Sequence, residues 1–160
     1  KALVLNKLFT KQLNNKSEYD YVFMDCPPAL NLITVNSLVA ASMVIIPLQT
    51  EFYALEGLSQ LIVTIKEIRN TLNKDLRILG VLLTMFDKRN NLSIQIEEDV
   101  RSTLSDLVFK TIIPRNVKLS EAPSYSIPGV IYDQKCNGSV AYQKLVSEFL
   151  NREQKILLSK

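Results

Sequence analysis

One acidic residue stands where a short apolar run ends, and its neighbours restrict the backbone around it. Residues 21–24 read YVFM, Asp25 follows, and then come Cys26, Pro27 and Pro28. An apolar strand that ends in a carboxylate places one negative charge at a sheet edge, a pattern typical of an acid that supports Mg²⁺ beside nucleotide phosphates. The two prolines fix the backbone just after this charge and remove two N–H donors. The same pattern also fits an aspartate that only caps the following turn.

The composition excludes several kinds of chemistry. The chain has no histidine, so it has no histidine-based triad and no histidine metal site. Its two cysteines, Cys26 and Cys136, are far apart and form no CxxC motif, which argues against zinc. The net charge of +3 permits contact with nucleic acid but does not argue for it, because phosphate binding needs clustered cations. Without a run of 18 apolar residues, no transmembrane helix is expected.

The spacing of apolar residues predicts alternating strands and helices. Continuous apolar runs predict buried strands at 19–25, 43–47, 79–85 and 109–113. Helical spacing predicts helices at 2–14, 34–41, 54–72, 92–107 and 139–150, with 154–160 as an extension or a loose end. This alternation predicts an α/β fold with a doubly wound, mainly parallel sheet, and we expect residues 1–160 to form a single domain.

The predicted topology gives the strand ends a role. In doubly wound sheets, ligands bind beyond the carboxyl ends of the strands. The loops that follow the four predicted strands cover residues 25–28, 47–51, 86–90 and 114–116. We therefore expect these four loops to gather along one rim.

Three blocks of the sequence closely resemble the ParA/Soj family of deviant-Walker P-loop ATPases, which partition chromosomes and plasmids. The blocks are YDYVFMDCPPALNLITVNSLVAASMVIIPLQTEFYALEGLSQL, GVLLTMFDKRNNLS and TIIPRNVKLSEAPSYSIPGVIYD. They follow one another in the family's order, and the resemblance extends from Tyr19 to Leu150. It implies a P-loop NTPase-like fold.

One motif of that family is absent from these residues. The family's ATP site needs a loop of the form KGGxGKT, whose backbone N–H groups cradle the phosphates. The four glycines, at positions 57, 80, 129 and 138, lie in no such pattern. We therefore interpret residues 1–160 as the C-terminal portion of a ParA-type ATPase domain, incomplete at its N-terminus. We expect that this chain alone neither holds ATP and Mg²⁺ nor hydrolyses ATP.

The resemblance implies roles for the residues around the first strand end. Asp25 corresponds to the Walker B and switch II acid, which supports Mg²⁺ through water and assists the attacking water. Pro27 and Pro28 correspond to the switch II loop that senses the γ-phosphate. Cys26 is interpreted as a small packing residue rather than a nucleophile.

A second group corresponds to the walls of the adenine pocket. Met85 stands where related NTPases read the base, and a soft apolar side chain suits packing on adenine. Pro114 and Arg115 correspond to the facing wall. A simple core position is the alternative for Met85.

The resemblance also implies partners. ParA-type proteins bind DNA without sequence preference as ATP-bound dimers, and Arg89 and Lys118 match their basic DNA-contacting positions. Lys88 adds charge beside Arg89. The alternative for each is an ordinary solvated side chain. A homodimer, a ParB-like protein that stimulates ATP turnover, and a cytoplasmic, nucleoid-associated location are implied as well, with no membrane contact.

Two other functions fit the same residues. The first is a non-catalytic module without a P-loop that binds DNA or protein. The second is a MinD-like division-site ATPase, which would need a membrane-binding C-terminal helix. The tail REQKILLSK has only a short apolar cluster, so it is a poor anchor.

Overall fold

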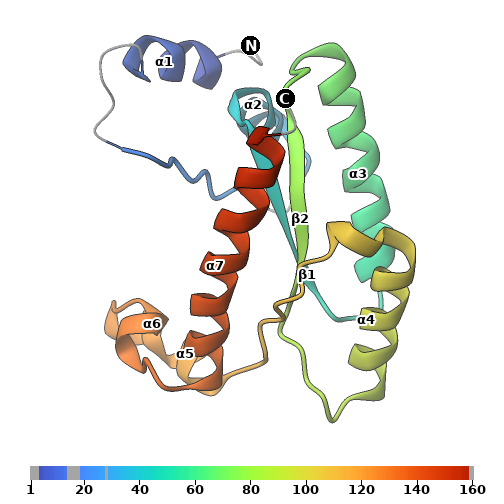
Figure 1. The fold of residues 1–160 in the computed structure, drawn as a ribbon, viewed down its shortest axis with the longest axis vertical. Coiled ribbons are helices and arrows are strands. Elements are labelled where there is room, and N and C mark those ends of the chain that lie inside the picture. The colour runs from blue at the N-terminus through green and yellow to red at the C-terminus, as the bar shows by residue number, and fades with distance from the viewer. Residues whose placement is uncertain (1–3, 14–18, 28, 159–160) are drawn as a thin grey trace. The chain divides into compact units, whose positions relative to one another are not determined.

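The computed structural model describes residues 4–13, 19–27 and 29–158 (Figure 1). The chain divides into two compact units, each considered by itself below: residues 1–44 with 59–77, and residues 45–58 with 78–160. The elements, in chain order, are α1 Val4–Leu13, α2 Leu32–Ala40, β1 Met43–Gln49, α3 Ala54–Thr71, β2 Arg77–Thr84, α4 Asn91–Leu104, η1 Ser105–Leu107, α5 Val117–Glu121, η2 Ala122–Tyr125, α6 Gly129–Tyr132 and α7 Asn137–Leu158. The predicted α/β class is confirmed, with β1 and β2 as parallel neighbours joined through α3.

In the first unit, both ends of α2 are held by asparagine side chains. Asn31 caps this helix, because its side-chain oxygen accepts from the N–H groups of Ile33 and Thr34 at 3.0 and 3.2 Å. After α3, the side chain of Asn73 donates to three carbonyls at the end of α2, at 2.7 to 3.1 Å. Leu76 follows, and it is completely buried. These bonds fix the turn between α3 and β2.

The predicted strand at 19–25 is not formed. Within the described part of the chain, residues 19–27 are irregular and pair with no strand. Tyr19 and Phe23 are both 75% exposed. A strand exists only when a neighbour accepts its backbone hydrogen bonds, and an apolar run cannot supply that neighbour by itself.

The predicted strand at 109–113 is not formed, and an isolated parallel bridge lies on either side of it. One joins Val81 of β2 with Val108, and the other joins Phe86, two residues after β2, with Pro114. Two hydrogen bonds connect this segment to β2, from the N–H of Phe109 to Val81 O and from the N–H of Ile113 to Leu83 O, both at 2.9 Å. The segment therefore runs beside β2 without becoming a regular strand.

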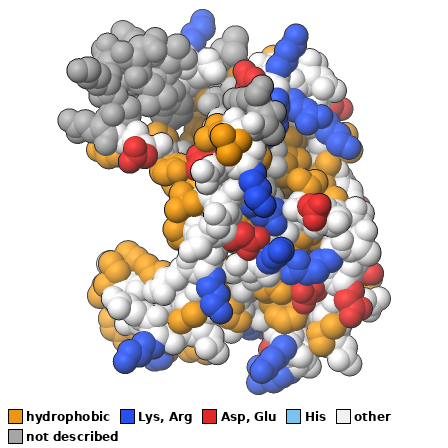
Figure 2. Space-filling model, viewed as in Figure 1, with side chains coloured by type: hydrophobic (Ala, Val, Ile, Leu, Met, Phe, Trp, Pro, Cys, Tyr) orange, Lys and Arg blue, Asp and Glu red, His pale blue; other side chains and the backbone are white. Residues whose placement is uncertain are grey.

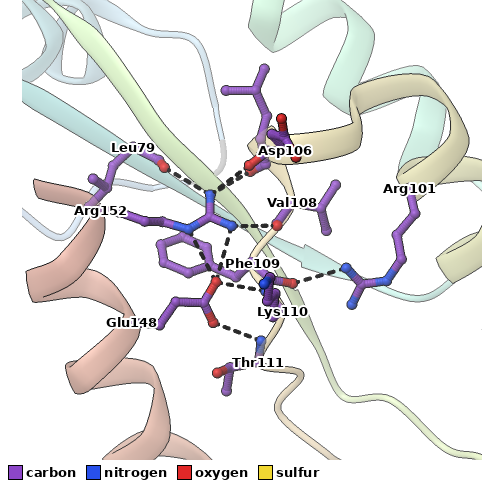
Figure 3. A network of polar contacts seen from close by, with 10 residues as sticks. Leu79, Arg101, Asp106, Val108, Phe109, Lys110, Thr111, Glu148 and Arg152 are labelled. Carbon is purple, nitrogen blue, oxygen red and sulfur yellow. Dashed lines mark hydrogen bonds and ion pairs between the residues drawn. The ribbon is translucent and has the colours of Figure 1, made fainter. Parts of the chain in front are cut away.

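The cause is a network between this segment and α7 (Figure 3). The backbone N–H groups of Lys110 and Thr111 donate to the carboxylate of Glu148 at 2.7 and 2.8 Å. The N–H of Thr111 therefore does not pair with β2, although those of Phe109 and Ile113 on either side of it do. Arg152 lies one turn further along α7, pairs with Glu148 at 3.1 Å and donates to Val108 O at 2.6 Å. We call Glu148 and Arg152 the α7 clamp. It holds the segment that leads to the predicted adenine wall.

The predicted helices are confirmed, with shifts at their ends. The helix expected at 92–107 ends as α4 at Leu104 and continues as the turn η1, because Ser105 takes a positive φ of 46°. The final helix extends to Leu158. In Figure 1, α7 and α4 lie on opposite sides of β2, within the second unit. The buried apolar side chains of that unit are Ile46, Leu48, Leu58, Leu79, Val81, Leu82, Leu83, Ile96, Val100, Val108, Phe109, Ile113, Ala122 and Ala141.

Candidate nucleotide and DNA site

The predicted walls of the adenine pocket lie side by side in the second unit. Phe86 donates its N–H to Ile113 O at 3.2 Å, and Arg115 donates its N–H to Phe86 O at 2.9 Å. Together with the Phe86–Pro114 bridge, these bonds place the end of β2 next to residues 113–115. The structure thus brings the backbones of two predicted site segments together.

Met85 is not a core residue. Its φ is 53°, in the left-handed region that methionine rarely adopts, and its side chain is 38% exposed. Met85 directly follows Thr84, the last residue of β2, whereas Leu83 within the strand is completely buried. Strained residues of this kind cluster at functional sites. The exposure therefore favours a surface role over the alternative of core packing.

The loop after β1 is fixed from within the same unit. Thr50 is 3% exposed, and its hydroxyl donates to the hydroxyl of Ser93 at 3.1 Å. The N–H of Thr50 lies 3.4 Å from Thr84 O. These bonds connect the loop with the end of β2 and the start of α4. Three of the four loops that we expected along one rim, 47–51, 86–90 and 114–116, therefore lie together in the second unit.

The fourth loop, with Asp25, belongs to the first unit. Asp25 and Pro27 are exposed, and Cys26 is half-buried with its Sγ 3.6 Å from Met24 O. The hydroxyl of Thr34 donates to Ala29 O at 2.6 Å, which connects this loop with α2. Pro28 lies outside the described residues. The predicted role of Asp25 stays a prediction.

Arg89, the first predicted DNA contact, is held by an acid of its own loop. Its Nε and Nη2 donate to the two carboxylate oxygens of Asp87 at 3.0 and 2.9 Å. Its backbone N–H also donates to Asp87, at 3.0 Å. The side-chain hydrogen bond from Arg89 is the main cause that lowers the pKa of Asp87 to about 2. The Arg89 side chain is 84% exposed, so a phosphate can reach it.

Lys118, the second predicted DNA contact, also pairs with an acidic side chain close to it in the sequence. Its Nζ donates to Glu121 at 3.0 Å and lies 5.9 Å from the centre of the Tyr132 ring. The hydroxyl of Tyr132 donates to the same oxygen of Glu121 at 3.3 Å. The hydrogen bond from Lys118 lowers the pKa of Glu121, and the same bond raises the pKa of Lys118. Asn116 positions Lys118 by capping α5.

Two further predicted residues are exposed cations. Lys88 and Arg115 are both on the surface. Among the described residues neither has a carboxylate within ion-pair distance. The rim of the second unit therefore offers two paired and two unpaired cations, an arrangement that can bind phosphate groups.

The acids that hold Arg89 and Lys118 were missed by sequence reasoning, although their spacing was visible. Asp87 precedes Arg89 by two residues, and Glu121 follows Lys118 by three, a spacing that brings charges together on one helical face. Both acids reduce the net charge that a phosphate would meet. The paired cations are therefore less attractive to DNA than a list of basic residues indicates.

The residues that would hold nucleotide and Mg²⁺ fit only part of such a site. No group of three or more potential metal-ligating side chains occurs in the part of the chain that is described. Mg²⁺ on nucleotide phosphates commonly uses one or two carboxylates together with water and phosphate oxygens, so a single exposed Asp25 matches this donor set. Met85 and Pro114 match an apolar wall for a base. The phosphate cradle has no counterpart among the glycines of these 160 residues.

Comparison with known proteins defines the class first. The structure resembles the Mycobacterium smegmatis cobyrinic acid a,c-diamide synthase solved with ADP and magnesium, at 30% identity and a TM-score of 0.73 over 96% of this chain and 56% of that one. It also resembles the Pyrococcus furiosus cell division ATPase MinD, at 21% identity and a TM-score of 0.74 over 94% of this chain and 59% of that one, a likeness of fold alone. The fold is that of P-loop NTPases.

Sequence comparison gives the family. The model of an AAA domain, AAA_31, matches residues 2–78. The chromosome partitioning protein ParA of Caulobacter vibrioides is 55% identical over 84% of this chain and 51% of its own length. The sporulation initiation inhibitor protein Soj of Bacillus subtilis is 53% identical over 83% of this chain and 53% of its own length. The chain belongs to the ParA/Soj family of partitioning ATPases, and it spans about half the length of these curated relatives.

The helices of the described residues give no candidate for a membrane span, because none combines sufficient length with sufficient apolar character.

Proposed function

We propose that this chain is the C-terminal portion of a ParA/Soj-type ATPase that partitions a chromosome or plasmid. The observation that carries the proposal is the 55% identity with a chromosome partitioning protein over 84% of the chain. The full-length protein would bind ATP with Mg²⁺, hydrolyse ATP, dimerise and bind DNA without sequence preference. We place it in the bacterial cytoplasm on the nucleoid, with a ParB-like partner.

The nucleotide part of the proposal rests on Asp25, Pro27, Met85, Pro114 and Arg115. Bound Mg²⁺ would neutralise phosphate charge, and Asp25 would hold its water shell. Met85 and Pro114 would contact the adenine, and the exposed Arg115 would lie at the edge of that wall. Because no Walker A loop occurs in these residues, we propose that the remainder of a longer protein supplies the phosphate cradle.

Thermal melting with Mg·ATP tests this division of the site. A ligand that binds the native state raises the melting temperature. We expect no shift for residues 1–160 and a clear shift for the full-length protein, which Asp25→Asn reduces. Asp20→Asn, which neutralises an exposed acid on the same segment, is the matched control. A shift for residues 1–160 alone would show that the phosphate cradle had been located wrongly.

The DNA part of the proposal rests on Arg89 and Lys118, with Lys88 beside them. A fluorescent 30-base-pair duplex titrated with the full-length protein and Mg·ATP would measure it. We expect Arg89→Ala and Lys118→Ala each to weaken binding and to reduce the salt dependence by about one unit of slope. Lys135→Ala removes an exposed lysine from another loop and is the control. Equal affinities for all three variants would contradict the assignment.

Dimerisation and the partner have their own measurements. Light scattering should show a dimer with ATP and a monomer without it, for a variant that cannot hydrolyse the nucleotide. A ParB-like protein should raise the ATPase rate of the full-length protein. Binding to DNA without any nucleotide dependence would favour the alternative of a non-catalytic module. Binding to anionic vesicles with Mg·ATP would favour the MinD-like alternative.

A further inference from the structure

A cluster of cations at the turn between α3 and β2 has no role in the site described above. Arg69, Asn70, Lys74 and Arg77 line one open cavity of ≈ 380 Å³. All four belong to the first unit. Figure 2 shows Lys and Arg side chains gathered over the C-terminal part of α3. Arg69 and Lys74 are exposed, and Arg77 is half-buried.

These cations differ from Arg89 and Lys118 in lacking acidic partners. Among described residues, none of Arg69, Lys74 and Arg77 has a carboxylate within 4.0 Å. The nearest acid in sequence, Asp75, is exposed and joins no ion pair in the described part of the chain. The cavity therefore keeps an excess of positive charge that an anion can neutralise.

The helix dipole at the C-terminal end of α3 accounts for one cation at this turn, but not for three. The carbonyl end of a helix carries about half a negative charge, which stabilises one neighbouring cation by about 0.3–1 kcal/mol. Three cations around one cavity exceed that charge and repel one another. An anionic ligand removes this repulsion.

The turn that carries the cluster is rigid, which favours binding. The side chain of Asn73 donates to the carbonyls of Leu38, Val39 and Ala41, and Leu76 is completely buried. Arg77 uses one nitrogen, Nη1, to donate to Lys74 O at 2.8 Å and to Leu76 O at 3.2 Å. Its other donors stay open for a ligand. Because the backbone of the turn is held, an anion has to order only the side chains of Arg69 and Lys74, which limits the conformational entropy lost on binding.

We propose that Arg69, Lys74 and Arg77, with Asn70, form a second contact site for DNA backbone phosphates. The proposal rests on DNA binding by the full-length protein, as proposed above, but assigns it a surface that the rim does not include. Arg77 is the first residue of β2 and belongs to the first unit, whereas Arg89 follows β2 and belongs to the second unit.

The surroundings favour DNA over other phosphate ligands. A small nucleotide needs an enclosed, largely apolar pocket, whereas this cavity is open and is lined by three cationic side chains and one amide. Anionic lipid surfaces are recognised by clusters of about four to eight cations, more than are present here. Non-specific contact with a duplex needs only separate cations that each meet a phosphate.

The test compares two double variants of equal charge in the full-length protein. Arg69→Ala with Lys74→Ala removes two cations of the cluster and leaves Arg77, which also bonds its own turn. Lys135→Ala with Lys144→Ala removes two exposed lysines elsewhere. Anisotropy of a labelled 30-base-pair duplex is measured with Mg·ATP from 50 to 200 mM NaCl, after circular dichroism shows that both variants are folded.

The salt slope is the slope of log affinity for DNA against log salt concentration. We expect the cluster variant to reduce its magnitude by about 1.8, so that the loss of affinity between 50 and 200 mM NaCl becomes about twelvefold smaller. The control should leave the slope unchanged. Equal slopes for the two double variants would overturn the inference, as would loss of binding to anionic vesicles with DNA affinity unchanged. If Arg89→Ala and Lys118→Ala have no effect while the cluster variant does, the rim assignment fails and this inference stands. The opposite result refutes this inference and leaves the rim assignment intact.

Discussion

The α7 clamp offers the sharpest test of how the fold supports the site. We predict that Arg152→Ala destabilises the protein far more than the loss of an ordinary surface charge. The guanidinium is only 18% exposed and donates to Val108 O at 2.6 Å and to Asp106 O at 3.0 Å. It also lies 4.3 Å from the centre of the Phe109 ring. Removing it leaves Glu148, itself 17% exposed, without its cation.

The magnitude follows from these contacts. A hydrogen bond to a charged group contributes about 1.5–3 kcal/mol, and two of the bonds from Arg152 have good lengths. The cation–ring contact adds about 0.5–1 kcal/mol. Ordering the long side chain costs about 2 kcal/mol, which the variant recovers. We therefore expect the free energy of unfolding to fall by about 3 kcal/mol, at the lower limit for breaking a buried ion pair.

Urea unfolding measures this loss. With a slope of about 2 kcal/mol per molar urea, the midpoint should fall by about 1.5 M. Lys144→Ala removes an exposed charge from the same helix and should change stability by less than about 0.5 kcal/mol. If Arg152→Ala matched this control, the network in Figure 3 would not hold the segment before the adenine wall.

The pH dependence of Glu148 provides an independent check. Burial alone would raise the pKa of Glu148, but the N–H groups of Lys110 and Thr111 and the charge of Arg152 lower it. A lowered native pKa means that the ionised carboxylate stabilises the fold above its unfolded pKa of about 4.3. That contribution is lost as the pH falls through the lower native pKa. The stability difference between the native protein and Glu148→Gln should therefore be largest near neutral pH and shrink below pH 4.

Three further changes test other parts of the structure. Asn73→Ala should cost about 2–3 kcal/mol in thermal or urea unfolding, since three carbonyls at the end of α2 lose their donor; a smaller loss would mean that the turn is held otherwise. Gly80→Ala should destabilise the protein by about 1–3 kcal/mol, because the new Cβ would lie 2.9 Å from the backbone oxygen of Leu107 in η1. Gly57→Ala is the control, because its Cβ would have no atom within 4 Å, and it should be neutral or stabilising by about 1 kcal/mol. The pKa of Asp87 should be about 2 by NMR and should rise after Arg89→Ala, although the backbone N–H of residue 89 still donates to the carboxylate and keeps the pKa lowered. An unchanged pKa would contradict the ion pair.

Much of the fold could be predicted from the sequence because the helices and the two strands of the described residues have local signals. The apolar spacing at 54–72 and the apolar run at 79–85 correspond closely to α3 and β2. An apolar face or run determines which side chains leave water, and this depends on neighbours along the chain. The family resemblance likewise depended on three blocks of sequence, and comparison with known proteins confirmed it.

Strand pairing and the electrostatic partners needed the tertiary structure. Residues 19–25 have the apolar content of a strand, yet in the described part of the chain they join neither strand of the sheet. Residues 109–113 lose regular pairing because Glu148, nearly forty residues later, accepts from the N–H of Thr111, which lies between the two N–H groups that do pair with β2. A sequence pattern states that a backbone can be extended, but only the neighbour in space decides which hydrogen bonds form.

The sequence by itself determined the class of fold, the family and the residue types at the rim, since these follow from local patterns and motif order. The tertiary structure decided that Met85 is exposed and that Asp87 and Glu121 pair with Arg89 and Lys118. It also decided that Arg69, Lys74 and Arg77 share one cavity with no acidic partner among the described residues. Charge–charge energy depends on distance and on exposure to water, and neither quantity is contained in the order of residues along the chain.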